Sequence, residues 1–272
     1  MARHPRRNEG KGQGAGWSPA AHRGARPAAK HGPASAASDW VWGWHATLAA
    51  LANPQRGPAK RLVATAERAK ELAARLPSLA AAEIVDAAAI AQLLPAGAAH
   101  QGIALKASPP EPLALDELAS PAHGVLVMLD QVTDPQNVGA VFRSAAAFGA
   151  RGVIVQDRHA PAFSGALAKA AAGALDGVPH ARVVNLARAL DELDRLGWRA
   201  VGLAGDAAEP LDQVLDRRPT VLVLGSEGDG LRRLVSEHCD ALARIPMPGG
   251  FESLNVSAAA AIALYEAVRP RS

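Results

Sequence analysis

The side chains of this chain that could do chemistry gather in three short stretches of its C-terminal half. Asn137 and Arg143 stand in the first stretch, "DQVTDPQNVGAVFRSA", and Glu227 stands in the second, "LVLGSEGDGLRR". The third stretch, "IPMPGGFESLNVSAAAAIALYEA", contains Ser253, Asn255 and Ser257. Arg and Asn side chains can bind phosphates and oxyanions, whereas a carboxylate suits a ligand with cationic character. Each stretch also has a plainer interpretation, in which its polar groups only cap a helix or face solvent.

The first stretch predicts a turn followed by a helix. Asp134-Pro135 favours the turn, and Asn137 can cap the helix that begins after it. Because Asn137 and Arg143 are six residues apart, they would not share one face of a straight helix. We therefore expect Asn137 to act from the loop and Arg143 from the helix. The alternative is an ordinary cap and a surface arginine, although an incidental charge is costly within a nearly apolar helix.

The second stretch is an apolar run that leads into Gly225, Gly228 and Gly230. A glycine-rich turn between a strand and a helix lets the backbone approach a ligand closely. The stretch matches neither the Gly-Lys-Ser/Thr phosphate loop nor the G-x-G-x-x-G dinucleotide pattern. Glu227 would repel a phosphate, so it indicates a cationic ligand or an arginine that needs orienting.

Strand-like and helical segments alternate through the C-terminal half, which predicts an α/β fold with a parallel, doubly wound sheet. We expect strands at residues 125–130, 152–156, 180–184, 199–203, 220–224 and 242–246, and helices at residues 138–149, 163–175, 185–196, 229–238 and 254–268. Ligands of such sheets bind outside the carboxyl ends of the strands, here the loops after Asp130, Ala204, Leu224 and Ile245. Since all three polar stretches fall in these loops, capping alone becomes an improbable explanation.

The N-terminal part divides into a basic tail and a small α/β unit. Residues 1–39 carry seven Lys and Arg against two Asp and Glu, a net charge of +5, and lack Leu, Ile, Val and Phe. Such a segment buries too little apolar surface to order itself, so we expect a disordered tail that either attracts RNA or is dispensable. Residues 40–107 predict alternating short strands and helices, and the proline-rich residues 108–123 predict a linker.

Composition excludes several classes of protein. The single cysteine, Cys239, excludes an internal disulfide and a Cys-based zinc site, and no His/Cys/carboxylate cluster has metal-ligand spacing. The N-terminus lacks the apolar core of a secretory signal, and no apolar run approaches the length of a membrane span. We expect a cytoplasmic protein with no metal and no membrane partner.

The three stretches, in their order and spacing, resemble the successive motifs of the SpoU (TrmH-like) branch of the SPOUT RNA methyltransferases. The resemblance covers about residues 124–269, and it implies a parallel-sheet SPOUT methyltransferase domain over 124–272 with a C-terminal trefoil knot. Residues 40–107, with "WGWHATLAALAN" and "HQGIALKA", resemble the substrate-binding domain of bacterial 23S rRNA (guanosine-2′-O)-methyltransferases. That domain has a small, ribosomal-protein-like RNA-binding fold, on which His100 and Gln101 are candidates for the RNA-facing surface.

The resemblance also implies a cofactor and roles for individual residues. S-adenosylmethionine would lie bent in the knot, and a homodimer would build the pocket. Arg143 would activate the ribose 2′-hydroxyl, either as a general base or, as we prefer because arginine normally stays protonated, by binding an oxyanion. Asn137 would orient Arg143 and the ribose, Glu227 would pair with Arg143 or an adjacent polar group, and Ser253 and Asn255 would complete the pocket. The residues that would hold the cofactor are Ala204, Gly205, Leu224, Gly225, Ile245, Met247, Leu254 and Ser257.

Two alternatives remain open. One is the same chemistry on tRNA or on another rRNA nucleotide, against which the N-terminal unit argues. The other is a ribosome-assembly RNA-binding protein with an inactive catalytic domain, against which the complete set of polar residues argues. A nicotinamide dehydrogenase is excluded because the glycine fingerprint and its following acidic residue are missing.

Overall fold

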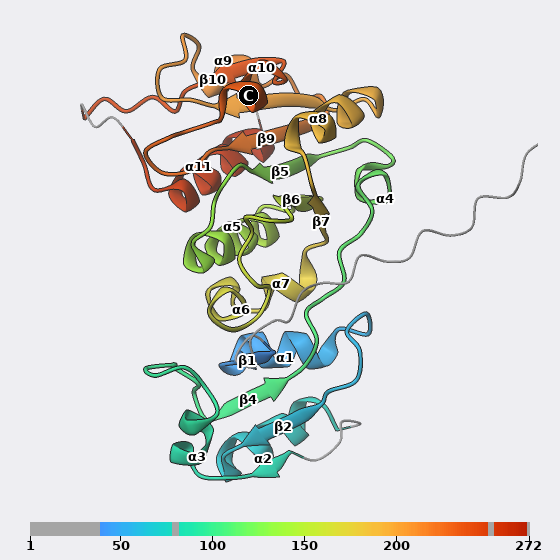
Figure 1. The fold of residues 1–272 in the computed structure, drawn as a ribbon, viewed down its shortest axis with the longest axis vertical. Helices are drawn as coiled ribbons and strands as arrows, with labels where there is room; N and C mark the ends of the chain where they lie inside the picture. Colours follow the sequence, from blue (N-terminus) through green and yellow to red (C-terminus); the bar gives the residue numbers. More distant parts are fainter. Residues whose placement is uncertain (1–38, 78–81, 250–252, 271–272) are drawn as a thin grey trace, which may run out of the picture. The chain divides into compact units, whose positions relative to one another are not determined.

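The computed structural model describes residues 39–77, 82–249 and 253–270 (Figure 1). The predicted tail therefore lies outside the described residues except for Asp39. Residues 40–106 contain a four-stranded sheet in the order β1 (Trp40–Trp42), β4 (Ile103–Lys106), β2 (Arg61–Ala64), β3 (Glu83–Ile84). Strand β4 runs antiparallel to both β1 and β2, whereas β2 and β3 are parallel. The accompanying helices are α1 (Trp44–Ala52), α2 (Ala66–Arg75) and α3 (Ala87–Gln92).

A six-stranded sheet in which every pairing is parallel forms the C-terminal part, as the alternation of segments predicts. Its strand order is β10 (Ala241–Ala243), β8 (Arg199–Leu203), β9 (Thr220–Leu224), β5 (Val125–Leu129), β6 (Gly152–Gln156), β7 (His180–Val183). The longer helices are α5 (Pro135–Ala147), α8 (Leu186–Arg195) and α11 (Val256–Val268), and the shorter ones are α4 (Leu115–Ala119), α6 (Gly165–Ala171), α7 (Ala174–Gly177), α9 (Leu211–Val214) and α10 (Arg233–Glu237).

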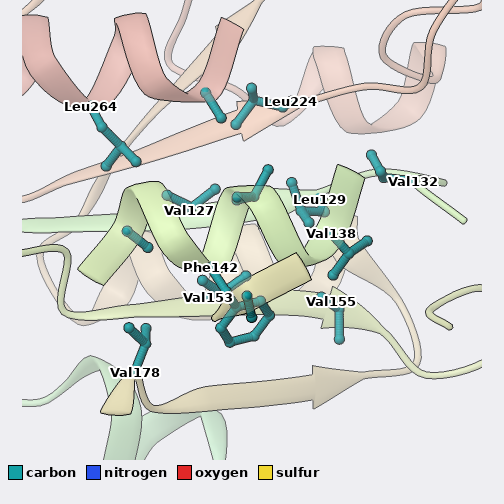
Figure 2. Packing of buried hydrophobic residues seen from close by; sticks show 14 of the residues in the cluster. Val127, Leu129, Val132, Val138, Phe142, Val153, Val155, Val178, Leu224 and Leu264 are labelled. Carbon is teal, nitrogen blue, oxygen red and sulfur yellow. The ribbon is translucent and has the colours of Figure 1, made fainter. Parts of the chain in front are cut away.

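Helices cover both faces of this sheet, so alternate residues of one strand enter different cores. Val127 and Leu129 of β5 pack with Phe142 of α5 and Leu264 of α11 (Figure 2). Leu126 and Met128 of the same strand face the other way and pack against α8 and α4. All five residues of β5 are buried, which explains why this strand is apolar without alternation.

Four local features differ from the sequence-based prediction. Helix α5 begins at Pro135, because Asp134 rather than Asn137 is its N-cap and accepts hydrogen bonds from the N–H groups of Gln136 and Asn137. The helix expected over 163–175 is two helices, since Ala172 and Gly173 have φ of 50° and 98° and break it. The helix expected from 229 starts only at Arg233. Two short helices, α4 and α9, were not predicted.

Gly139 permits a close crossing between α5 and α6. A Cβ at this position would lie 2.6 Å from both the Ala170 Cβ and the Leu167 carbonyl oxygen, closer than real Cβ atoms come. Both helices pack in the same core, and Gly139 lies two residues after Asn137, so the close crossing is made beside the first turn of α5.

Gly139→Ala should lower the free energy of unfolding by about 1–3 kcal/mol, because overpacking outweighs the helix propensity that alanine gains. The matched control is Gly177→Ala, where a Cβ meets nothing within 4 Å. Urea denaturation of both variants measures the difference. Equal stability of the two alanine variants would contradict the close-crossing argument.

Candidate active site

A cavity of about 700 Å³ opens at the carboxyl edge of the sheet, beside strands β8, β9 and β10. This volume falls in the usual range for small-molecule sites. Its walls come from the loops after those three strands and from the first turn of α11. The described residues that line it include Leu203, Ala204, Gly205, Asp206, Leu224, Gly225, Glu227, Asp229, Arg233, Ile245, Met247, Ser253, Leu254, Val256 and Ala259.

Seven of the eight residues proposed to hold the cofactor line this cavity. They are Ala204, Gly205, Leu224, Gly225, Ile245, Met247 and Leu254. The eighth, Ser257, does not, because its backbone N–H and hydroxyl both donate to the Asn255 side chain within the first turn of α11. These seven residues line one cavity and Ser257 lies in the first turn of α11, while contact of any of them with the cofactor stays a prediction.

The residues between β9 and Arg232, 225–231, form a loop that we call the glycine loop. Gly228 and Gly230 have φ of 87° and 66°, and the Gly230 N–H donates to the Ser226 carbonyl oxygen (3.0 Å). A Cβ on Gly225 would lie 2.1 Å from the carbonyl carbon of Gly230. Gly225 is therefore required by the return of the loop over its own start, a close backbone approach within the chain.

One carboxylate oxygen joins the three polar stretches. Glu227 Oε1 accepts hydrogen bonds from Asn137 Nδ2 (2.9 Å), from Asn255 Nδ2 (2.6 Å) and from the backbone N–H of Val256 (3.4 Å). Asn255 Nδ2 also donates to Asn137 Oδ1 (2.9 Å). We call Asn137, Glu227 and Asn255 the polar triad. Residues separated by 90 and 28 positions along the chain thus meet at one point beside the cavity.

Asn255 has two roles at once. Its side-chain oxygen caps α11 by accepting from the N–H groups of Ser257 (3.0 Å) and Ala258 (3.3 Å). Its amide nitrogen, left free by capping, serves the polar triad. The capping interpretation of the third stretch is therefore confirmed, and the same side chain also joins the polar triad, whose role as a ligand site stays a prediction.

Arg143 stands apart from this network. It is exposed on α5, and within the described part of the chain it makes no hydrogen bond or ion pair. Within the described residues Asn137 makes no contact with Arg143, and of the two partners expected for Glu227 the structure shows the adjacent polar groups rather than Arg143. Asn137 lies in the first turn of α5 rather than in a loop, and its side chain is committed to Glu227 and Asn255.

The charges around the cavity select for a cationic ligand. Among the described residues that line it, three carry carboxylates, Asp206, Glu227 and Asp229, and one carries a guanidinium, Arg233, which itself pairs with Glu237. Apolar walls from Leu224 and other strand-end residues complete the cavity. A ligand with an aromatic base, a sulfonium and an ammonium fits this donor set and volume, so the residues present suit S-adenosylmethionine.

Neither a nucleophilic thiol nor a metal site accompanies the cavity. Burial raises the pKa of the Cys239 thiol to about 12, and the carboxylates of Asp240 and Asp130 add to the rise, so no reactive thiolate forms there. The described residues contain no cluster of His, Cys, Asp and Glu that could hold a metal. Nor does any described helix combine the length and apolar character needed to cross a membrane.

His100 and Gln101 form a turn with internal hydrogen bonds. Gln101 has φ of 56°, and its amide oxygen accepts from the Trp44 N–H (3.0 Å) and from Lys169 Nζ (2.7 Å). His100 Nδ1 accepts from the Gly102 N–H (3.1 Å). Through these hydrogen bonds both side chains stabilise the local structure. Their contact with RNA stays a prediction.

Sequence models of two known domains match the chain. The SpoU rRNA methylase family matches residues 124–265, which is more than half of the chain and contains the whole polar triad. The chain belongs to the SpoU rRNA methylase family. The domain described as RNA 2′-O ribose methyltransferase substrate binding matches residues 40–113. The chain is accordingly an RNA 2′-O-methyltransferase.

Several proteins that are similar to this chain are named as methyltransferases. A 23S rRNA (guanosine-2′-O-)-methyltransferase RlmB from Pseudomonas aeruginosa is 44% identical over 178 residues, covering 64% of this chain and 72% of the relative. RlmB from Xylella fastidiosa is 48% identical over 182 residues, covering 65% and 73%. The SpoU methyltransferase AviRb from Streptomyces viridochromogenes, solved with AdoMet, is 27% identical with a TM-score of 0.71, covering 84% of this chain and 88% of that one.

The two roles of Asn255 can be separated by substitution. Asn255→Ser keeps an N-cap oxygen but removes the amide donor, so it should change stability by only a few tenths of a kcal/mol and lower methyl transfer strongly. Asn255→Ala removes both groups and should cost a further 0.5–2 kcal/mol, roughly, of unfolding free energy. Urea denaturation and transfer of labelled methyl groups to RNA measure the two effects. Wild-type transfer by Asn255→Ser would show that Asn255 is only a cap.

Proposed function

We propose that this chain transfers a methyl group from S-adenosylmethionine to the ribose 2′-hydroxyl of a guanosine in 23S rRNA. The polar triad beside an acidic cavity is the observation that carries the proposal. The identity of 44–48% to the RlmB proteins supports the choice of RNA and nucleoside. The substrate-binding domain at residues 40–113 supports a large folded RNA rather than a small molecule.

The cofactor supplies a methyl group on a positively charged sulfur, which is electrophilic without further activation. The carboxylates of Asp206, Glu227 and Asp229 favour binding of that positive charge over a neutral product. A transferred methyl group neutralises the sulfur, so the same carboxylates then hold the product less well. This accounts for acidic residues at a site that also has to admit a phosphate-bearing RNA.

The polar triad supplies fixed dipoles for the incoming ribose. Asn137 donates through Nδ2 and accepts through Oδ1, so its amide cannot rotate without breaking two hydrogen bonds. The guanidinium of Arg143, which has no hydrogen-bond or ion-pair partner among the described residues, supplies mobile positive charge on the same helix. We assign it to the ribose 2′-oxygen, where negative charge develops as the hydroxyl proton is lost to solvent, or to the adjacent phosphate, which already carries its charge. Ser253, exposed at the rim of the cavity, completes the site.

Asn137→Ala and Arg143→Ala should each lower kcat by about 10²–10⁴-fold and leave the melting temperature within a few degrees of wild type. The reason is that Asn137 positions the site and Arg143 supplies charge, while neither belongs to the apolar core. Arg188→Ala, an exposed arginine on α8, is the matched control. Near-normal turnover by either site variant would remove that residue from the mechanism.

A homodimer and the trefoil knot belong to the same proposal. Along α11, Ile262 and Tyr265 are 42% and 56% exposed and Val268 is 43% exposed, although this helix has almost no polar face. The opposite side of the helix, including Ala260 and Leu264, is fully buried. We propose that a second copy covers the exposed side and brings an Arg143 to each site. The domain division at residues 40–107 and 124–272 is also part of the proposal.

Substitutions on the two sides of α11 test the dimer. Ile262→Arg should abolish dimerisation with little loss of fold, because Ile262 faces outward, and transfer should fall with it. Ala260→Glu should instead lower the free energy of unfolding by several kcal/mol, on the order of the cost of burying an unpaired charge. Sedimentation across a dilution series measures the share of dimer in the wild type and in both variants. A wild-type monomer at micromolar concentration that methylates RNA would contradict the proposal.

The substrate is tested by methylating full-length 23S rRNA, 16S rRNA and tRNA transcripts with labelled cofactor and digesting them to nucleosides. The proposal expects 2′-O-methylguanosine from 23S rRNA alone. Label in tRNA, in 16S rRNA or in another nucleoside of 23S rRNA would favour the same chemistry on another substrate. Tight rRNA binding without cofactor binding would favour an inactive assembly protein.

A further inference from the structure

An ion pair between a buried carboxylate and a partly exposed guanidinium lies at the far end of the glycine loop, outside the cavity. Asp130 directly follows β5 and is 0% exposed. Its carboxylate accepts hydrogen bonds from the backbone N–H of Arg232 (2.9 Å) and from Arg232 Nε (2.7 Å), and Arg232 Nη2 lies 2.7 Å from Asp130 Oδ1. Loss of such a partner would leave a buried charge unpaired and strongly destabilise the fold. The pairing therefore tightly constrains the position of Arg232.

Other strand ends contribute to the same network. Arg232 Nη2 donates to Gln156 Oε1 (3.1 Å) at the end of β6, and Gln156 Nε2 donates to the Val184 carbonyl oxygen (3.3 Å) just after β7. The Asp130 N–H donates to the Leu224 carbonyl oxygen (2.8 Å), immediately before the glycine loop. Asp130 therefore holds both ends of that loop, its start through the backbone and its end through the carboxylate.

The glycine loop is held in its middle by the hydrogen bond from Gly230 to Ser226 and by the hydrogen bonds that Glu227 accepts. Its described residues are half-buried or exposed, and two of them are glycines in the left-handed region. Every residue of the loop nevertheless lines the cavity, and Glu227 must reach the polar triad from it. Asp130 and Arg232 line no part of the cavity and make no hydrogen bond to Glu227.

We propose that the Asp130–Arg232 pair is the anchor that sets the glycine loop, and through it Glu227, in the geometry that binds the cofactor. Both are positioning residues, since they act only through the loop. The inference rests on the proposed function, because it assumes that the cavity binds S-adenosylmethionine. It extends that function by adding two residues that neither touch the cofactor nor belong to the polar triad.

Cofactor affinity and loop exchange test the anchor. Asp130→Asn and Arg232→Lys, which keep the shape of each side chain approximately, should raise the Kd for S-adenosylmethionine by about tenfold or more. They should raise KM for the cofactor more than they lower kcat. Backbone amides of the glycine loop, Gly230 in particular, should exchange hydrogen faster than in wild type. Calorimetric titration and hydrogen-exchange mass spectrometry, well below each melting temperature, give these values.

The control is Asp176→Asn, which breaks a different, buried ion pair, with Arg56, whose side chains are 2% and 3% exposed. This variant should lose stability and keep the wild-type Kd. If Asp130→Asn does not fold, Arg232→Lys decides, since it keeps a positive charge and the backbone hydrogen bond. Wild-type Kd and exchange in the anchor variants, or an equal loss of affinity in the control, would overturn the inference. A wild-type protein that binds no cofactor would instead overturn the proposed function.

Discussion

The site depends on the parallel arrangement of the six-stranded sheet, which brings loops from distant parts of the chain to one edge. Glu227 Oε1 is where they converge, because it accepts hydrogen bonds from α5, through Asn137, and from the start of α11, through Asn255 and Val256. No single one of these loops could form the site. A change that shifts β5, β9 or α11 relative to the others would therefore separate the polar triad and alter the cavity that Glu227 lines.

The same edge combines opposite electrostatic demands. The cavity is acidic and suits a cationic cofactor, whereas an RNA substrate carries negatively charged phosphates. The amide groups of Asn137 and Asn255 donate to Glu227, so its carboxylate is engaged by the protein itself. Arg143, with no partner in the described part of the chain, is left available for negative charge. The two Asn amides are held by hydrogen bonds within the site, whereas Arg143 can bind a negatively charged group of the substrate.

Much of this could be predicted from the sequence because strong local patterns point to it. Continuous apolar runs such as Val125–Leu129 predicted buried parallel strands, and the rule that ligands bind at carboxyl ends located the cavity. The N-cap of α5 was wrong by three residues, since Asp134 and Asn137 are equally good capping residues and only the fold decides between them. The break at Ala172 was missed because an alanine with positive φ has no sequence signature.

Contacts between residues that are far apart in the sequence could not be predicted, for a different reason. Nothing in the residues around Asp130 and Arg232 shows that they meet, since their contact depends on the order β9-β5 within the sheet. Likewise, Glu227 could have paired with Arg143 or with an amide on sequence grounds. The structure selects the amides because the first turn of α5, rather than its middle, faces the glycine loop.

The central claim is that the cavity at the carboxyl edge binds the cofactor with the polar triad beside it. A crystal structure of the full chain with S-adenosylhomocysteine tests this most directly. The account predicts density for the ligand between Leu224, Ile245 and Leu254, with the hydrogen bonds among Asn137, Glu227 and Asn255 intact. Ligand bound elsewhere, or a cavity that binds it only after Glu227 has left Asn137 and Asn255, would contradict the account.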